Sequence, residues 1–155
     1  MERAYKSLKE LLEAKAAAGV HAVGVKAMVL DALALMKEKN IGSVLVLDGE
    51  KLAGIITERD YARKGILAGR LAKDTPVSET MTREVVTVTL AYTVQQCMAL
   101  MTERRVRHLP VVEDGRILGV LSIGDLVAEV VSHHEHVIRD LQREMMPIFT
   151  SPDSY

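Results

Sequence analysis

An internal repeat is the feature that most constrains the fold of this chain. The stretch "GIITERD" from Gly54 returns as "GVLSIGD" from Gly119, so a glycine, two aliphatic residues, a hydroxyl residue and an aspartate recur at the same spacing. The offset is 65 residues for the glycines and the aspartates alike, and it also aligns "ALM" from Ala34 with "ALM" from Ala99. The chain is therefore expected to build one supersecondary unit twice.

The hydrophobic pattern predicts the same order of elements in each repeat. A β-branched stretch comes first, then a helix with apolar residues three and four apart, then two apolar strands joined by a turn rich in aspartate and glycine, and then a second helix after the aspartate. The expected order is β-α-β-β-α, twice. In the two repeats the successive stretches are "VHAV" and "VVTV", "MVLDALALMKEK" and "TVQQCMALMTER", "SVLVLD" and "HLPVVE", "LAGIIT" and "ILGVLS".

Composition excludes several classes of protein. The 155 residues are 48% hydrophobic, and 20 basic against 21 acidic residues leave a formal charge of −1, so no broad basic field is available for duplex DNA or anionic lipid. No apolar run is long enough to cross a bilayer, and the charged N-terminus does not resemble a signal peptide. The single cysteine, Cys97, excludes an internal disulfide and is expected to be a small core residue. These features predict a cytoplasmic protein.

The repeated motifs resemble the tandem CBS domain, also called the Bateman module, and most closely its small bacterial stand-alone members. The resemblance covers roughly Val20 to Val131 and rests on "DALALM", "IGSVLVLDGEKLAGIITERD", "CMALM" and "RHLPVVEDGRILGVLSIGD". It implies an α+β fold in which two β-α-β-β-α repeats are related by pseudo-twofold symmetry. The expected segments are an N-terminal helical extension (1–19), the two repeats (20–75 and 76–132), and a C-terminal helix and tail (133–155).

The recurring hydroxyl and aspartate are the main candidates for ligand contact. Thr57 and Asp60, like Ser122 and Asp125, lie three residues apart where a strand ends and a helix begins. The hydroxyl could act as an ordinary N-cap, and the same junction could accept a phosphate while the carboxylate accepts both hydroxyls of a ribose. In the family this position binds nucleotide ribose, and two copies at one offset favour that interpretation over a simple cap.

Positive charge for a phosphate is available in "ERRVRHLP", which supplies Arg105, Arg107 and His108 before the second repeat's central strand. Period-two alternation predicts that Arg105 and Arg107 lie on one side of an extended segment, and arginine suits phosphate oxygens. Arg104 is expected instead to be a solvated residue at the end of the helix, where its charge interacts favourably with the helix dipole.

The resemblance further implies that each cleft is built from both repeats. Asp60 is expected to share its site with Arg105 and Val106, and Asp125 with Ile41 and Gly42. The remaining expected contacts are the apolar walls against the base, formed by Ile41, Ile55, Val106 and Val120, and the adenine edge, approached by Thr87 and Thr89.

No catalytic constellation or metal site is expected. His133 and His136 lie three apart on the predicted terminal helix, where a solvated or dimer-facing role is favoured over metal binding. The apolar residues from Met145 to Phe149 could cover a partner or remain loose.

The favoured function is therefore a sensor of adenine nucleotides (AMP, ADP, ATP or NAD(H)) that forms a homodimer and acts on a separate partner enzyme. A ligand-independent interaction scaffold and a sensor of S-adenosylmethionine are the alternatives. Arg105 and Arg107 argue against the latter, because they would repel its sulfonium.

Overall fold

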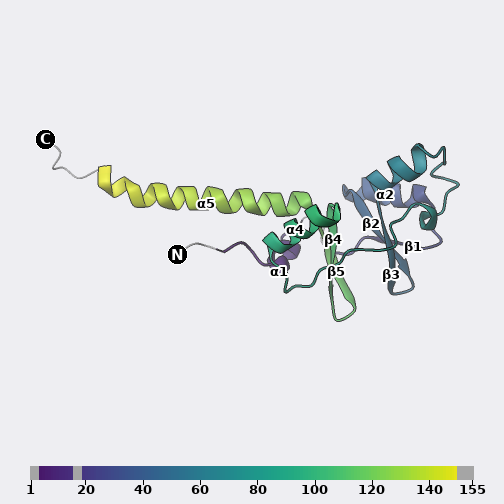
Figure 1. Ribbon diagram of the computed structural model, residues 1–155, viewed down its shortest axis with the longest axis horizontal. Coiled ribbons are helices and arrows are strands. Elements are labelled where there is room, and N and C mark those ends of the chain that lie inside the picture. Colours follow the sequence, from purple (N-terminus) through teal and green to yellow (C-terminus); the bar gives the residue numbers. More distant parts are fainter. Residues whose placement is uncertain (1–3, 16–18, 150–155) are drawn as a thin grey trace.

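The computed structural model of the protein describes residues 4–15 and 19–149, with side chains as far as Met145. The rest of the expected apolar tail, and the segment after it, lie outside the described side chains. Twelve elements follow one another in the described ranges (Figure 1): α1 Leu8–Glu13, β1 Ala22–Gly24, α2 Val29–Lys39, β2 Ser43–Asp48, β3 Lys51–Thr57, α3 Glu58–Asp60, the π-helical turn η1 Tyr61–Ile66, the 3-10 turn η2 Val77–Glu79, α4 Val94–Arg104, β4 His108–Glu113, β5 Arg116–Ser122 and α5 Ile123–Phe149.

The predicted order β-α-β-β-α is confirmed in both repeats, with one strand reduced in the second. In the first repeat β1 runs parallel to β2, which pairs antiparallel with β3. In the second, β4 and β5 form the matching antiparallel pair, and only Val88 makes a parallel bridge to Val111 where the first repeat has β1. That bridge carries two backbone hydrogen bonds, from Val88 N to Pro110 O (3.0 Å) and from Val112 N to Val88 O (2.8 Å).

Each repeat has its own hydrophobic core. In the first, α2 packs Val29 and Met36 against the strand residues Val44 and Ile56. The core of the second repeat includes Leu8 and Leu11 of α1 together with residues of α4, β4, β5 and α5. The N-terminal helix, although it precedes the first repeat in sequence, therefore packs against the second (Figure 1).

The last helix is longer than the repeat requires. The segment boundary expected between residues 132 and 133 falls inside α5, which is continuous over 27 residues. Leu126 near its beginning is fully buried in the second core, whereas its C-terminal half extends away from the body (Figure 1). Among the described residues, no helix combines the length and apolar character that a membrane span requires.

Two glycines at the repeat offset allow a matched test of packing. A Cβ on Gly54 would lie 2.8 Å from Thr82 O, whose backbone is held by hydrogen bonds to Ile55, whereas a Cβ on Gly119 would lie 2.9 Å from Leu12 Cδ2, at the end of a side chain that can rotate. We expect Gly54→Ala to lower the free energy of unfolding by about 1–3 kcal/mol and Gly119→Ala to lower it less. Urea denaturation measures both, and an equal loss would contradict this account.

Cys97 is fully buried in the second core, and burial raises the pKa of its thiol to about 11. Because the thiolate is the reactive form, iodoacetamide at pH 8 should leave the native protein unmodified and alkylate it fully in guanidinium. An exposed cysteine introduced as Arg143→Cys serves as the control that must react in the native state. Rapid native alkylation of Cys97 would show that the second core opens readily.

Candidate functional site

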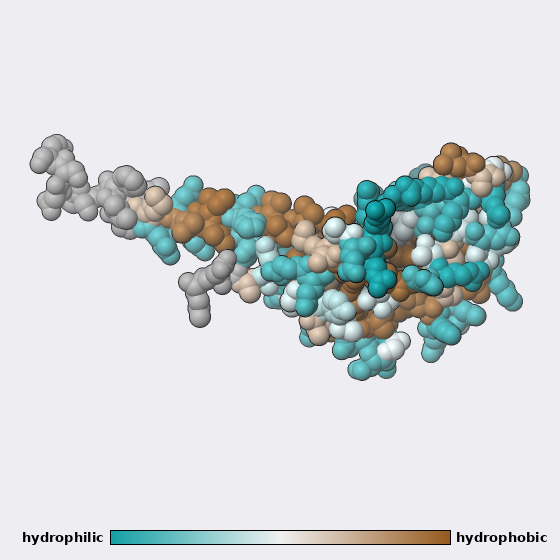
Figure 2. All heavy atoms as spheres, viewed as in Figure 1, coloured by the Kyte–Doolittle hydropathy of each residue, from teal (hydrophilic) through white to brown (hydrophobic). Residues whose placement is uncertain are grey.

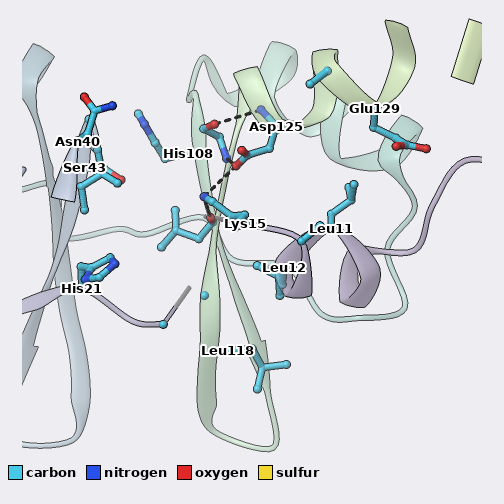
Figure 3. A pocket seen from close by; sticks show the side chains of 18 of the residues that line it. Leu11, Leu12, Lys15, His21, Asn40, Ser43, His108, Leu118, Asp125 and Glu129 are labelled. Atoms are coloured by element: carbon cyan, nitrogen blue, oxygen red, sulfur yellow. Dashed lines mark hydrogen bonds and ion pairs between the residues drawn. The ribbon is translucent and has the colours of Figure 1, made fainter. Parts of the chain in front are cut away.

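A cavity of about 650 Å³ lies where the two repeats and the N-terminal segment meet (Figure 3). Asp125 at the start of α5 lines it, and so does His108 at the start of β4. The other lining residues used below are Ile41, Gly42 and Ser43 from the first repeat, Val120 and Ser122 from the second, and Leu12, Lys15 and His21 from the N-terminal segment and the start of the first repeat. Ile41 and Gly42, which were expected to share a site with Asp125, thus line the same cavity.

The capping box at the start of α5 fixes the carboxylate of Asp125. Its Oδ2 accepts a hydrogen bond from Ser122 N (2.8 Å), while Asp125 N donates to Ser122 Oγ (3.2 Å). Lys15 Nζ lies 2.9 Å from the same Oδ2 and donates to the carbonyl oxygen of Val120 at 2.6 Å (Figure 3). The carboxylate of Asp125 is therefore held in place, and it forms an ion pair with a lysine from outside the repeat.

Asp60 has the same cap but a different neighbour. Thr57 N donates to Asp60 Oδ2 (3.0 Å), and Asp60 N donates to Thr57 Oγ1 (3.1 Å). Thr82 Oγ1 donates to the other carboxylate oxygen at 3.3 Å, and Lys64 Nζ lies 3.6 Å from it. Both helices begin at the residue after the hydroxyl, at Glu58 and Ile123, three residues earlier than a helix that begins after the aspartate.

Each aspartate is contacted by a residue from outside its own repeat. Thr82, near the start of the second repeat, contacts the aspartate of the first repeat, and Lys15, on the segment before the first repeat, contacts that of the second. Both carboxylates thus have a lysine ammonium nearby, but that of Lys64 is 3.6 Å from Asp60, whereas that of Lys15 is 2.9 Å from Asp125. Sequence reasoning missed Thr82 and Lys15, since neither lies in the most similar part of the repeats and neither carries a motif.

His108, at the start of β4, is a further polar group that lines the cavity. Its ring lies beside Gly42, where a Cβ would be 3.5 Å from Nε2. Burial lowers the pKa of His108 from its ordinary value, and the nearby positive charge of Lys15 lowers it further. The imidazole is consequently neutral at pH 7 and contributes a hydrogen-bonding group rather than the positive charge expected of it.

The arginine segment differs from its prediction. Arg105 has a φ of 54° and caps α4 in the left-handed conformation, so the chain turns there and the expected alternation with Arg107 does not hold. Both side chains are exposed. Asn40 has the matching conformation after α2, with a φ of 53°.

The other predicted contacts fall in several environments. Val106 packs against the second core and Ile55 is buried on β3. Thr87 and Thr89 are exposed, and Thr89 Oγ1 accepts a hydrogen bond from Ala91 N (3.3 Å) in a local turn. Neither threonine lines the cavity at Asp125.

The histidines of α5 lie in different environments. His133 is buried, with its ring centroid 4.5 Å from that of Tyr5, whereas His136 is exposed. A solvated position is therefore wrong for His133, because Tyr5, which precedes α1, packs against its ring, and the dimer-facing alternative stays a prediction. No group of three or more histidine, cysteine or acidic side chains suited to a metal ion occurs within the described ranges.

The chain is similar to several known proteins over most of its length. It is 44% identical over 118 residues to a mitochondrial CBS domain-containing protein of Arabidopsis thaliana, an alignment that spans 73% of this chain and 57% of the plant protein. A solved structure of a CBS-domain protein from Burkholderia ambifaria has 46% sequence identity and a TM-score of 0.78, and the match covers 82% of this chain and 95% of that one.

A third relative was solved with ligands. It is a CBS domain pair in complex with 5'-methylthioadenosine and S-adenosyl-L-methionine, with 25% sequence identity, a TM-score of 0.70, and coverage of 80% of this chain and 94% of that one. The family model for the CBS domain matches residues 17–65 and 77–132, one match for each repeat. Because the family model matches both repeats, this chain belongs to the CBS domain family as a tandem CBS protein.

Proposed function

We propose that this protein is a regulatory sensor of adenine nucleotides (AMP, ADP, ATP or NAD(H)), which it binds in the clefts between its repeats. The observation that carries the proposal is the carboxylate of Asp125, fixed by its helix cap at the edge of a cavity lined by both repeats. A fixed carboxylate is suited to accept the two hydroxyls of a ribose, because no side-chain rearrangement is needed to orient it.

Other groups in the cavity suit the rest of such a ligand. His21 Nε2 is buried and has no hydrogen-bond partner within the described ranges, so a polar edge of the ligand would satisfy it. Neutral His108 adds a second hydrogen-bonding ring, and Ile41 and Val120 offer apolar surface to a base. A cavity of about 650 Å³ is within the size range of small-molecule sites.

The position of Lys15 favours a phosphorylated ligand over S-adenosylmethionine. The related domain pair solved with two adenosine derivatives supports an adenosine moiety. Lys15 must leave Asp125 when a ribose binds there, and its released ammonium would attract a phosphate and repel a sulfonium. The exposed Arg105 and Arg107 add positive charge at the end of α4.

Binding in such a cleft gives a route to regulation. A ligand that contacts both repeats stabilises the relative orientation that it fits best, and it shifts the population only if the alternatives bind it less well. We propose that this shift is read by a separate partner enzyme in the cytoplasm and that the working form is a homodimer.

A ligand-independent scaffold is the second candidate. Both aspartates already have hydrogen-bond partners in their capping boxes, which a purely structural role would also require. Ligand titration separates the two functions.

The first test is isothermal titration with AMP, ATP, NADH and S-adenosylmethionine, repeated on Asp60→Asn and Asp125→Asn. Asparagine keeps an oxygen for the cap but loses the charge, so we expect affinity at the altered cleft to fall about tenfold, as the loss of one charge-assisted hydrogen bond predicts. Asp31→Asn is the matched control, because Asp31 caps α2 in the same way, at 2.9 Å from Met28 N, without lining the cavity. No binding of any of the four compounds would favour the scaffold.

The second test concerns Lys15. In the Asp60→Asn background, Lys15→Met should raise the affinity for adenosine roughly fivefold, because a competing ion pair worth about 1 kcal/mol is removed. AMP should gain less, since its phosphate loses the released ammonium. Lys6→Met is the control: Lys6 lines the same cavity, but its ammonium lies 4.0 Å from Glu129. An unchanged adenosine affinity would mean that Lys15 does not compete with the ribose.

A further inference from the structure

One face of α5 carries a continuous hydrophobic stripe that nothing in the described chain covers. Apart from one histidine its members are apolar, and all are exposed: Val127 (44%), Val131 (51%), His134, Ile138 (54%), Leu141 (53%) and Met145 (53%). Figure 2 shows hydrophobic side chains gathered along α5 where the helix leaves the body. We call this set the α5 stripe.

The α5 stripe is separate from the face that packs on the body. Leu126, Glu129 and His133 are the buried residues of α5, and they lie on an adjacent face of the helix. The family match ends at residue 132, so most of the stripe lies beyond the CBS repeat itself. After His133, the described side chains are exposed except for the half-buried Val137. Because most helical stability in proteins comes from tertiary packing of an amphipathic face, a partner on the stripe would stabilise this part of α5.

The spacing of the stripe identifies the kind of partner. Its members follow one another at intervals of four, three, four, three and four residues, which is the 3.5-residue period of a coiled-coil seam rather than the 3.6-residue period of a helix on a globular core. Val131, Ile138 and Met145 take the a positions, and Val127, His134 and Leu141 take the d positions. The covering element is therefore a second helix.

We propose that α5 pairs in parallel with α5 of a second copy of this chain, forming a two-stranded coiled coil through the α5 stripe. The inference rests on the homodimer of the proposed function and names the surface that forms it, but it is independent of any ligand. The seam contains no carboxylate, lysine or arginine, so self-pairing brings no fixed like charges together at its centre. Identical helices also give a closed twofold contact, in which each stripe covers the other.

Charge at the edges of the seam selects the parallel arrangement. In a parallel pair Glu135 lies opposite Val130 of the second copy, and Gln142 lies opposite Val137. In the antiparallel arrangement Glu135 would face Glu135 of the second copy, where two carboxylates repel. The parallel pair avoids this repulsion along the described seam.

The first experiment measures molar mass by sedimentation equilibrium of the full chain at concentrations from 1 to about 100 μM, the range of ordinary protein–protein affinities. We expect a dimer that becomes a monomer in Ile138→Glu/Leu141→Glu, a halving of mass. Arg143→Glu, on the outer face of the same helix, should remain a dimer. Cys97 should stay unreactive in every variant, which verifies that the body is folded.

Two results would overturn the proposal at this stage. A wild-type monomer throughout the concentration range would mean that the stripe does not self-associate. A double variant that remains a dimer would place the contact on another surface of the molecule.

The second experiment tests the parallel register by disulfide formation. Leu141→Cys at a d position should cross-link to its counterpart under mild oxidation, because d residues of parallel helices face each other. Arg143→Cys should not, and the native buried Cys97 adds no background. Failure of Leu141→Cys to cross-link in a protein that sediments as a dimer would exclude the parallel arrangement. Nucleotide titration of the monomeric variant keeps this outcome separate from the proposed function.

Discussion

Both candidate sites depend on one local interaction: an aspartate carboxylate that accepts the backbone N–H of the hydroxyl residue three positions before it. This bond defines where the strand ends and where the helix begins, and it fixes the direction of the carboxylate. A second bond ties each helix to the loop before the repeat's central strand, from Glu58 N to Gly42 O (3.2 Å) and from Ile123 N to Arg107 O (2.9 Å). Helix, loop and carboxylate are thus positioned together, so a ligand would meet an arrangement that already exists.

The backbone of the two repeats is nearly symmetric, whereas the chemistry around the aspartates is not. Asp60 is contacted by the hydroxyl of Thr82 and has the Lys64 ammonium 3.6 Å away, whereas Asp125 has the Lys15 ammonium at 2.9 Å. A ribose at Asp60 would compete with a neutral hydrogen bond and a longer ion pair, and one at Asp125 with a shorter ion pair. The two clefts are therefore expected to differ in affinity and in their preference for charge, even though the motif that forms them is repeated.

Much of the fold could be predicted from the sequence because the pattern for each element occurs twice, once in each repeat. The central strands β2 and β4 have the bounds that the apolar runs indicated, and α2 and α4 differ by one residue at their start. The arginine segment was predicted wrongly because alternation assumes an extended chain, whereas Arg105 adopts a positive φ. Lys15 could not be found, since its role depends on α1 packing against the second repeat and no local pattern encodes that choice. The boundary before His133 was drawn from family resemblance, although no glycine or proline interrupts the helix there.

The packing of α1 against the second repeat also bears on how the chain acquires its structure. The contact from Lys15 to Val120 joins residues 105 positions apart, and that from Lys6 to Glu129 joins residues 123 apart. On the ribosome, the N-terminal segment emerges first, but its binding surface exists only after nearly all of the second repeat has been synthesised. Until then the apolar side chains of Leu8 and Leu11 remain without their native partners, so α1 can take its place only late in folding. Completion of the Asp125 cleft thus requires that the second repeat has already been synthesised and folded.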